Sequence, residues 1–179
     1  MRLLPSLVVL GGLSLLQMAC TSTKPPLHTV SHVDVPRYMG DWYVIGEIPN
    51  FAEKNCFDST ESYALLADGS IDNWFSCRRK SFDAPMKRVT GAKARIADSN
   101  TNASWRLRFY GVFSADYEIL DLDTSYQWVM VGHPSRSYGW IMARSRILPD
   151  STYEAILNRT RDQGYDPDLF KKVPQRGPE

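Results

Sequence analysis

Residues 40–48 read Gly-Asp-Trp-Tyr-Val-Ile-Gly-Glu-Ile, and this stretch indicates the fold class. Every second residue from Trp42 to Ile48 falls on one face of an extended strand, because side chains alternate between the two faces of a strand. Pro49-Asn50 then ends the strand with residues typical of turns. The stretch therefore predicts a strand with one face against a core.

The same two-residue period recurs along the chain, interrupted by turns at short intervals. Asp68-Gly69 predicts a hairpin, because both central positions of such a turn must tolerate a positive φ. After Pro149 the period changes to 3.6, which predicts one amphipathic helix. This pattern is typical of a β-sandwich or a β-barrel. The other expected strands are residues 61–65, 71–77, 89–96, 105–109, 117–122, 127–132 and 138–144.

The charge balance argues against nucleic acid as a partner. The chain has 21 Lys and Arg residues against 20 Asp and Glu residues, with no long run of either sign, whereas phosphate-backbone binding needs a basic patch. His28 and His32 have no cluster of metal ligands around them. We expect no metal and no cofactor.

The N-terminus has the pattern of an export signal. Arg2 precedes an apolar run from Leu3 to Leu16, which is too short for a transmembrane helix of about 20 residues. Ala19 before Cys20 resembles the bacterial lipobox, in which the cysteine is acylated and becomes the new N-terminus. Gln17 stands three residues before Cys20, where the lipobox usually has Leu. Ordinary signal-peptide cleavage needs a small residue at the same position, so Gln17 does not fit that signal either.

These features predict four segments. Residues 1–19 form a signal peptide, residues 20–34 a lipidated cysteine with a flexible polar spacer, residues 35–174 the folded domain and residues 175–179 a tail. Thr21 stands after the cysteine where some sorted lipoproteins have Asp, which by resemblance implies the outer membrane. Acyl chains on Cys20 would then hold the protein on the bilayer.

Three motifs, in order, resemble those of the lipocalin family. Gly40-Asp41-Trp42-Tyr43 matches its Gly-x-Trp motif, Leu122-Asp123-Thr124-Ser125-Tyr126 resembles its second motif and Trp140-Ile141-Met142-Ala143-Arg144 its third. The resemblance runs from Val35 to about Pro174 and is strongest to the bacterial outer-membrane lipoprotein lipocalins. It implies an all-β fold: an eight-stranded antiparallel up-and-down β-barrel with one C-terminal α-helix packed outside.

The resemblance also implies a closed end for this barrel. Arg144 would pack across Trp42 in a cation–π contact. The residues expected to close the barrel are Gly40, Trp42, Asp123, Tyr126 and Arg144.

Strand parity selects the side chains that face inward, given that Trp42 does. They are mostly aromatic and aliphatic, which suits an alkyl chain of a fatty acid or lysophospholipid. The alternative is that they fill the barrel completely. The expected cavity lining is Ile48, Phe51, Tyr63, Asn73, Phe75, Leu107, Phe109, Tyr117, Trp140 and Met142, and the same parity turns Val44 and Gly46 inward.

One acidic residue fits this lining poorly. Parity with Tyr63 turns Glu61 inward, where a carboxylate is costly unless it sits at a wet mouth or a bulge reverses its facing. Asn73 lies at the same level and could bind a head group.

Cys56 and Cys77 are an even pair once Cys20 is acylated, so an oxidising compartment favours a disulfide. A hairpin centred on Asp68-Gly69 places Cys77 opposite Thr60, too far from Cys56 unless a bulge, or the loop after the first strand, brings Cys56 back.

Catalysis is the less favoured interpretation. His133 is the histidine inside the domain and has no Gly-x-Ser-x-Gly motif nearby. We therefore predict a carrier of a small apolar ligand at the bacterial outer membrane, serving lipid storage or transport for membrane maintenance. The rival classes are a structural envelope lipoprotein with a filled barrel, and an isomerase or hydrolase using His133 or the cysteines. The resemblance also allows a homodimer.

Overall fold

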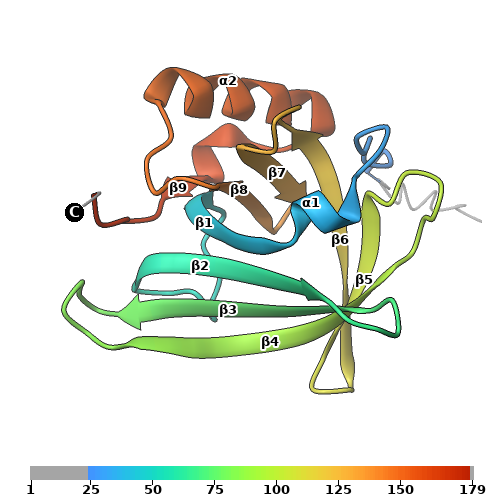
Figure 1. Ribbon diagram of the computed structural model, residues 1–179. Helices are drawn as coiled ribbons and strands as arrows, with labels where there is room; N and C mark the ends of the chain where they lie inside the picture. Colours follow the sequence, from blue (N-terminus) through green and yellow to red (C-terminus); the bar gives the residue numbers. More distant parts are fainter. Residues whose placement is uncertain (1–23, 178–179) are drawn as a thin grey trace, which may run out of the picture.

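Eight antiparallel strands form a closed ring in the computed structural model, which describes residues 24–177 (Figure 1). Each strand pairs with the next, and β1 pairs with both β2 and β8, so no edge of the ring is left open. The predicted barrel is confirmed. The strands are β1 (Gly40–Glu47), β2 (Cys56–Leu65), β3 (Ile71–Arg79), β4 (Met86–Ile96), β5 (Ser104–Phe109), β6 (Phe113–Leu122), β7 (Trp128–Gly132) and β8 (Gly139–Ala143).

Four further elements surround the ring. The predicted C-terminal helix is α2 (Asp150–Thr160), which covers one outer wall (Figure 1). A short helix, α1 (Val35–Tyr38), precedes β1, and a two-residue strand, β9 (Lys171–Lys172), pairs with β1. Two 3₁₀ turns, η1 (Arg161–Gln163) and η2 (Pro167–Leu169), connect α2 to β9. No helix within residues 24–177 is long and apolar enough to cross a membrane.

A β-bulge divides β1 into two halves of opposite facing. The register against β8 shifts between Val44 and Gly46, so Ile45 is the extra residue. Trp42 and Val44 point into the barrel, but beyond the bulge Ile48 packs in the outer core beneath α2. The expectation that Gly46 and Ile48 face inward is therefore wrong, because one inserted residue inverts every position after it.

Gly46 lies against Tyr153 of α2 on the outer wall of the barrel. A Cβ placed there would overlap the Tyr153 ring and hydroxyl. Gly46→Ala is expected to lower the free energy of unfolding by about 2 kcal/mol, because overpacking displaces the helix. Urea denaturation measures this change. Gly91→Ala in β4 is the matched control, since its Cβ would meet its nearest atom at 3.4 Å. An equal loss in both variants would contradict the predicted contact.

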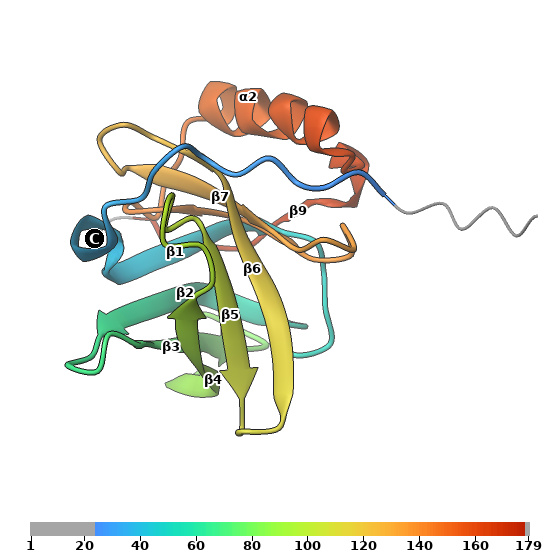
Figure 2. The ribbon, with the colours of Figure 1, turned by 90° about the vertical axis from the view of Figure 1, so that its right-hand side faces the viewer.

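The segment before α1 is packed on the barrel, unlike the spacer expected through residue 34. The Val33 side chain is fully buried, and its backbone N–H donates to the Thr101 carbonyl at 2.7 Å. Val30 donates to the Ile119 carbonyl at 3.0 Å, as the chain runs past β6 towards α1 (Figure 2). The two apolar side chains explain the difference, because burial in the core stabilises this segment. The predicted signal peptide and Cys20 lie outside the described residues.

The C-terminal segment bridges β1 and β2 beyond their last paired residues, unlike the tail expected from residue 175. Pairing between β1 and β2 stops at Tyr43 and Thr60. The Gln175 side-chain amide then donates to the Val44 and Ser59 carbonyls, both at 2.9 Å. Backbone groups left unpaired between two strands need such partners, which explains why residue 175 is ordered against the barrel.

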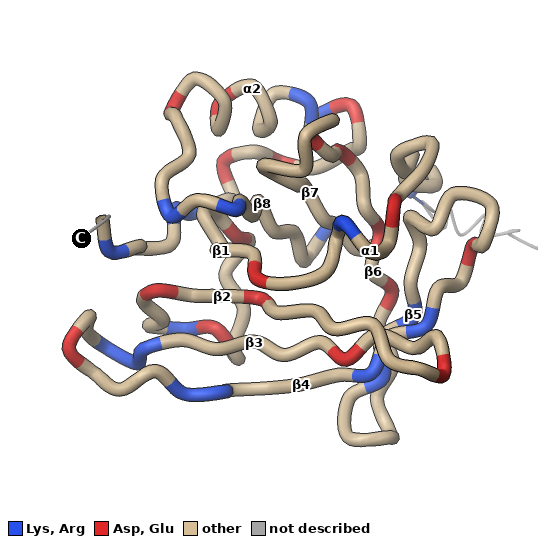
Figure 3. Tube along the Cα trace, in the orientation of Figure 1, with Lys and Arg blue, Asp and Glu red and all other residues tan. Residues whose placement is uncertain are grey.

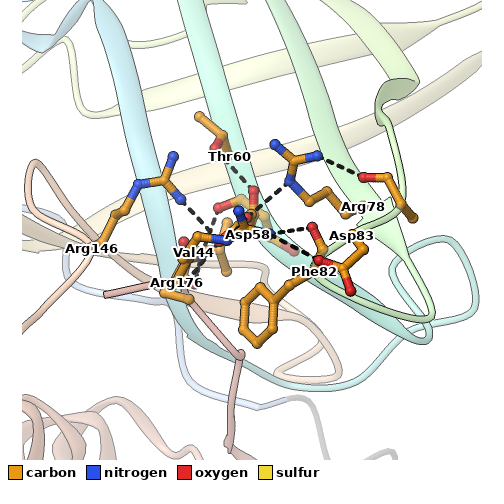
Figure 4. A network of polar contacts seen from close by, with 11 residues as sticks. Val44, Asp58, Thr60, Arg78, Phe82, Asp83, Arg146 and Arg176 are labelled. Atoms are coloured by element: carbon orange, nitrogen blue, oxygen red, sulfur yellow. Dashed lines mark hydrogen bonds and ion pairs between the residues drawn. The ribbon is translucent and has the colours of Figure 1, made fainter. Parts of the chain in front are cut away.

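Asp58 anchors the same segment from the β2 side (Figure 4). Its buried carboxylate accepts from Arg78 and Arg146 side chains, each at 3.0 Å, and from the Arg176 backbone N–H at 2.7 Å. The Arg176 guanidinium lies 3.9 Å from the same carboxylate. Three cations from separate parts of the chain therefore converge on one anion.

Cys56 and Cys77 form a disulfide, with Cα atoms 5.5 Å apart. The register of β2 against β3 shifts between Phe57 and Thr60, so Asp58 and Ser59 together lie opposite Cys77. Asp58 has a φ of 52°, as expected of a bulge residue that tolerates the left-handed region. The bulge supplies the shortening that a regular hairpin lacks.

Candidate ligand-binding site

Arg144 covers the closed end of the barrel. Its guanidinium carbon lies 3.8 Å from the centre of the Trp42 ring, a cation–π contact. It also donates to the Asp41 carbonyl at 2.6 Å. The other carbonyls that accept from Arg144 are those of Arg37, Tyr38 and Met39. The side chain thus satisfies the end of α1 and holds it across the barrel bottom.

The loop between β6 and β7 completes this end. Tyr126, with a φ of 61°, accepts from the Asp34 backbone N–H at 2.8 Å, and Arg37 lies 4.1 Å from its ring centre. Asp123 shapes the loop by accepting from the backbone N–H groups of Ser125 and Gln127. Gly40, with a φ of 90°, lies beneath Arg144. The five residues predicted to close the barrel are thus brought together at one end.

Aromatic rings fill the half of the barrel above this closure. Tyr38 contacts Trp42, Tyr63 and Trp105, with ring centres 5.1 to 5.4 Å apart. Trp105 stacks on Tyr117 at 5.0 Å. The Tyr117 hydroxyl is hydrogen-bonded to those of Tyr38 and Tyr63, at 2.6 and 2.8 Å. This half is a packed plug, so Tyr63 and Tyr117 contribute to a floor.

Two of the predicted lining residues lie outside the barrel interior. Ile48 is in the outer core, as described above. Phe51 is 91% exposed, in the loop between β1 and β2, where the chain turns over the rim instead of continuing the strand. The remaining predicted residues belong to the inner core or its margin: Tyr63, Asn73, Phe75, Leu107, Phe109, Tyr117, Trp140 and Met142.

Three acidic side chains lie on or beside the β1–β2 wall, and the sequence predicted an inward position only for Glu61, which pairs across the strands with Trp42. Glu53 comes from the loop between β1 and β2, and both of its oxygens accept from the Trp140 indole N–H, at 3.2 and 3.1 Å. Glu61 accepts from the Asn73 side chain at 2.6 Å. Glu47, beyond the bulge in β1, is 8% exposed. Only knowledge of the bulge could have turned Glu47 inward.

Burial changes the acidity of these groups. The pKa of Glu61 is raised to about 8 by burial and by the nearby charge of Glu53, against the effect of the Asn73 hydrogen bond. The pKa of Glu47 is also raised, by burial first and then by its contact with Glu53. Both groups therefore hold protons more strongly than an exposed glutamate, and this half of the barrel is polar at one wall.

Two hollows of the structure lie on the outside of the barrel. One is lined by α2, β6 and β7 residues, including Leu120, Met130 and Ile156, and the other lies beside Ile45 and Ile147.

His133 is in a rim loop, with its ring nitrogen Nδ1 2.8 Å from the Ser135 hydroxyl, and burial lowers its pKa. Within residues 24–177 no three His, Cys, Asp or Glu side chains are placed to hold a metal.

The fold and the site together define a class: an up-and-down barrel sealed at one end by an arginine on a tryptophan, with its inner wall largely apolar. Residues 33–175 match the model of the lipocalin-like domain. The chain belongs to this family.

Known relatives span nearly the whole chain. It is 31% identical to the outer membrane lipoprotein Blc of Escherichia coli K12 over 181 aligned positions, which cover 99% of each protein. It is 30% identical to temperature-induced lipocalin-1 of Arabidopsis thaliana over 164 positions, 85% of this chain and 84% of that protein. Insecticyanin from the tobacco hornworm Manduca sexta shares the fold, with a TM-score of 0.65 at 16% identity over 83% of this chain and 84% of that one.

Proposed function

We propose that this protein binds a single-chain lipid of the fatty acid or lysophospholipid class, and that it stores or transports this lipid at the bacterial outer membrane. Membership of the lipocalin-like family and similarity to an outer membrane lipoprotein support this proposal. The lipid would enter the end opposite the Arg144 closure. No step of this function requires catalysis, and the disulfide removes both thiols of the alternative enzyme.

The distribution of exposed apolar side chains carries the proposal. Six of the nine large apolar side chains that are exposed within residues 24–177 lie in or beside the loops at the open end. The tip of the β5–β6 hairpin is uncharged (Figure 3). An apolar rim around an apolar interior suits the passage of a hydrocarbon chain. The six residues are Phe51, Met86, Tyr110, Val112, Phe113 and Tyr138.

Acyl chains on Cys20 would hold the protein on the membrane. The Escherichia coli relative is an outer membrane lipoprotein, which supports this anchor. Several buried chains would make the attachment nearly permanent, at about 0.8 kcal/mol per CH₂. Mass spectrometry of the N-terminal peptide from the envelope fraction tests for this modification. A homodimer stays a prediction.

A filled barrel with a purely structural role is the second candidate. The aromatic packing of Tyr38, Tyr63, Trp105 and Tyr117 favours it, because these rings occupy the closed half. A lipid would then have only the open half, where Phe109 and Trp140 are partly exposed. Ligand uptake separates the two candidates.

Ala92→Trp is expected to reduce uptake of a fluorescent fatty acid at least tenfold, because the added ring fills the space that the chain would occupy. Ala92 is buried on the inner face, paired with Asn73 and Phe109. Fluorescence titration of delipidated protein measures the dissociation constant.

Lys93→Trp is the matched control, since Lys93 is the next residue and is exposed on the outer face. We expect it to bind as the wild type does. Near-ultraviolet circular dichroism checks that the barrel of Ala92→Trp is intact, and Ala92→Leu gives a graded loss. Absence of saturable uptake by the wild type would establish the structural candidate instead.

A further inference from the structure

The tip of the β5–β6 hairpin, residues 110–113, departs from the usual chemistry of its turn. Tyr110 and Gly111 both have a positive φ, of 49° and 74°, and the Val112 N–H donates to the Phe109 carbonyl at 3.0 Å. Asn or Asp followed by Gly is the usual choice for such a turn, because a bulky residue is strained at a positive φ. Tyr110 is 74% exposed, so packing in the core does not compensate this strain. The tyrosine therefore serves neither the turn nor the core.

The hairpin tip is apolar as well as exposed. Val112 is 76% and Phe113 is 69% exposed, and the hairpin extends past the neighbouring strands at the bottom of Figure 2. A contiguous group of exposed apolar side chains marks a contact surface. A stable protein interface has about 20 residues on each side, far more than this tip offers. Binding to a lipid layer grows with the buried apolar area and needs no such interface.

Positive charge lies directly behind the hairpin tip. Arg108 of β5 stands opposite Lys93 of β4, and both are exposed on the outer face, although like charges placed so destabilise a sheet. Asp68 lies 3.9 Å from Lys93, but no ion pair within residues 24–177 involves Arg108. An uncharged tip with cations behind it (Figure 3) matches the order of a bilayer, whose anionic head groups lie outside its acyl chains.

The N-terminal segment enters the fold at the same end of the barrel. Antiparallel order places the β5–β6 and β7–β8 loops together at the open end. The Lys24 side chain donates to the Ser135 carbonyl of the β7–β8 loop at 2.7 Å. Arg136 of the same loop donates to the Pro25 carbonyl. Cys20 is four residues before Lys24, a span of at most about 14 Å, so an acyl anchor there would keep the open end near the bilayer.

We propose that the β5–β6 hairpin is a second membrane contact. The hairpin tip inserts into the outer part of an anionic bilayer, Arg108 and Lys93 contact lipid phosphates, and the open end of the barrel faces the membrane. This deepens the proposed function, and only the orientation rests on the acyl anchor. A lipid site that opens on the bilayer exchanges its lipid with the membrane without a passage through water.

The first experiment locates the hairpin tip in the anchored protein. The whole protein is purified from the envelope and added to preformed vesicles of equal parts phosphatidylcholine and phosphatidylglycerol, with the dye NBD on Val112→Cys. The dye should be quenched by nitroxide lipids and protected from iodide in the water. Ser125→Cys, in the exposed β6–β7 loop at the closed end, is the matched control, and iodide should quench its dye. The wild type reveals any labelling of Cys20.

The second experiment measures the contribution of the hairpin tip without acyl chains. The chain from residue 20 with Cys20→Ser keeps every described strand and helix, and sedimentation with the same vesicles gives its partition coefficient. Tyr110→Ser with Phe113→Ser should lower this coefficient about tenfold, because two aromatic side chains no longer leave water. Leu65→Ser, at an exposed apolar residue of the closed end, is the matched control and should leave it unchanged. Near-ultraviolet circular dichroism checks that each variant keeps its barrel.

The charge behind the tip gives a further readout. Arg108→Gln should lower the partition coefficient about fivefold on the anionic vesicles, the change expected of one basic residue at an anionic surface. On vesicles of phosphatidylcholine alone it should have no effect. Arg95→Gln is the matched control, since Arg95 is exposed on the same face of β4 but lies 3.6 Å from Asp68, near the closed end. Equal losses for Arg108→Gln and Arg95→Gln would overturn the assigned role of Arg108.

The outcomes separate this proposal from the proposed function. Fatty acid uptake is measured without vesicles, so its failure removes the lipid site and leaves the membrane contact standing. A dye at residue 112 that stays in water, or serine variants that partition as the wild type does, would overturn the membrane contact and leave the lipid site standing. A dye at residue 125 inside the lipid would overturn the orientation. If the tip joins two copies of the chain instead, sedimentation equilibrium will show a dimer that the serine variants disrupt, and this also overturns the proposal.

Discussion

Replacing Trp42 by alanine is expected to lower the free energy of unfolding by about 4 kcal/mol, because it removes a large buried ring and leaves a cavity. Trp42 is fully buried at the closed end, and its indole N–H donates to the Tyr38 carbonyl at 2.8 Å. It also supports Arg144, whose guanidinium lies over its ring. Urea unfolding followed by circular dichroism measures the change.

Trp74→Ala makes the same chemical change at a partly exposed position of β3, where Arg88 lies 4.6 Å from the ring centre. We expect this control to lose about 1 kcal/mol, as a partly exposed contact of this kind does. Trp42→Phe should fall between the two, since it keeps a ring but loses the hydrogen bond to α1. Equal losses for Trp42→Ala and Trp74→Ala would show that the closure contributes little to stability.

Asp58→Ala is expected to cost about 3 kcal/mol, because it leaves several guanidinium groups around a buried site without their anion. The Asp58 side chain is 2% exposed, whereas the side chains of Arg78, Arg146 and Arg176 are 28 to 40% exposed. Because water can still solvate these three cations, the expected loss is at the lower end of the range for breaking a buried ion pair. For a chain of this size, we expect a fall in Tm of about 6 to 12 °C. Differential scanning calorimetry measures it.

Asp83→Ala tests whether charge alone explains this loss. Asp83 is 99% exposed and lies 4.0 Å from Arg176, so its removal should change stability by less than about 0.5 kcal/mol. Asp58→Asn keeps a residue that tolerates the positive φ of the bulge, and it isolates the contribution of the charge. If Asp58→Asn is as stable as the wild type, the backbone conformation and not the charge holds the segment.

The barrel and the C-terminal helix could be predicted from sequence because their signals are local. Alternation with a period of two runs through most of each strand between the bulges, and the Asp68-Gly69 turn fixes one hairpin. The facing of side chains was less predictable. A single extra residue at Ile45 turned Ile48 outward and Glu47 inward, and nothing in the alternation marks that residue.

Contacts between distant segments were the other part that sequence reading could not supply. Residues 24–34 and 174–176 look like polar ends, yet they bond to backbone groups of β1, β2, β6 and the loop before β5. Glu47 and Glu53 likewise depend on distant parts of the chain. The facing of Glu47 depends on the bulge in β1, and the position of Glu53 depends on a loop ordered by Arg79. Long-range placement of this kind has no periodic signature.

The position of Gln175 also bears on when the molecule can be completed. Its amide joins two carbonyls of the first hairpin, which lie 131 and 116 residues earlier in the chain. A polypeptide that emerges from its N-terminus first therefore leaves the Val44 and Ser59 carbonyls without this partner until residue 175 has appeared. Contacts between such distant residues slow folding, so the native ring is completed only after residue 175 has been made.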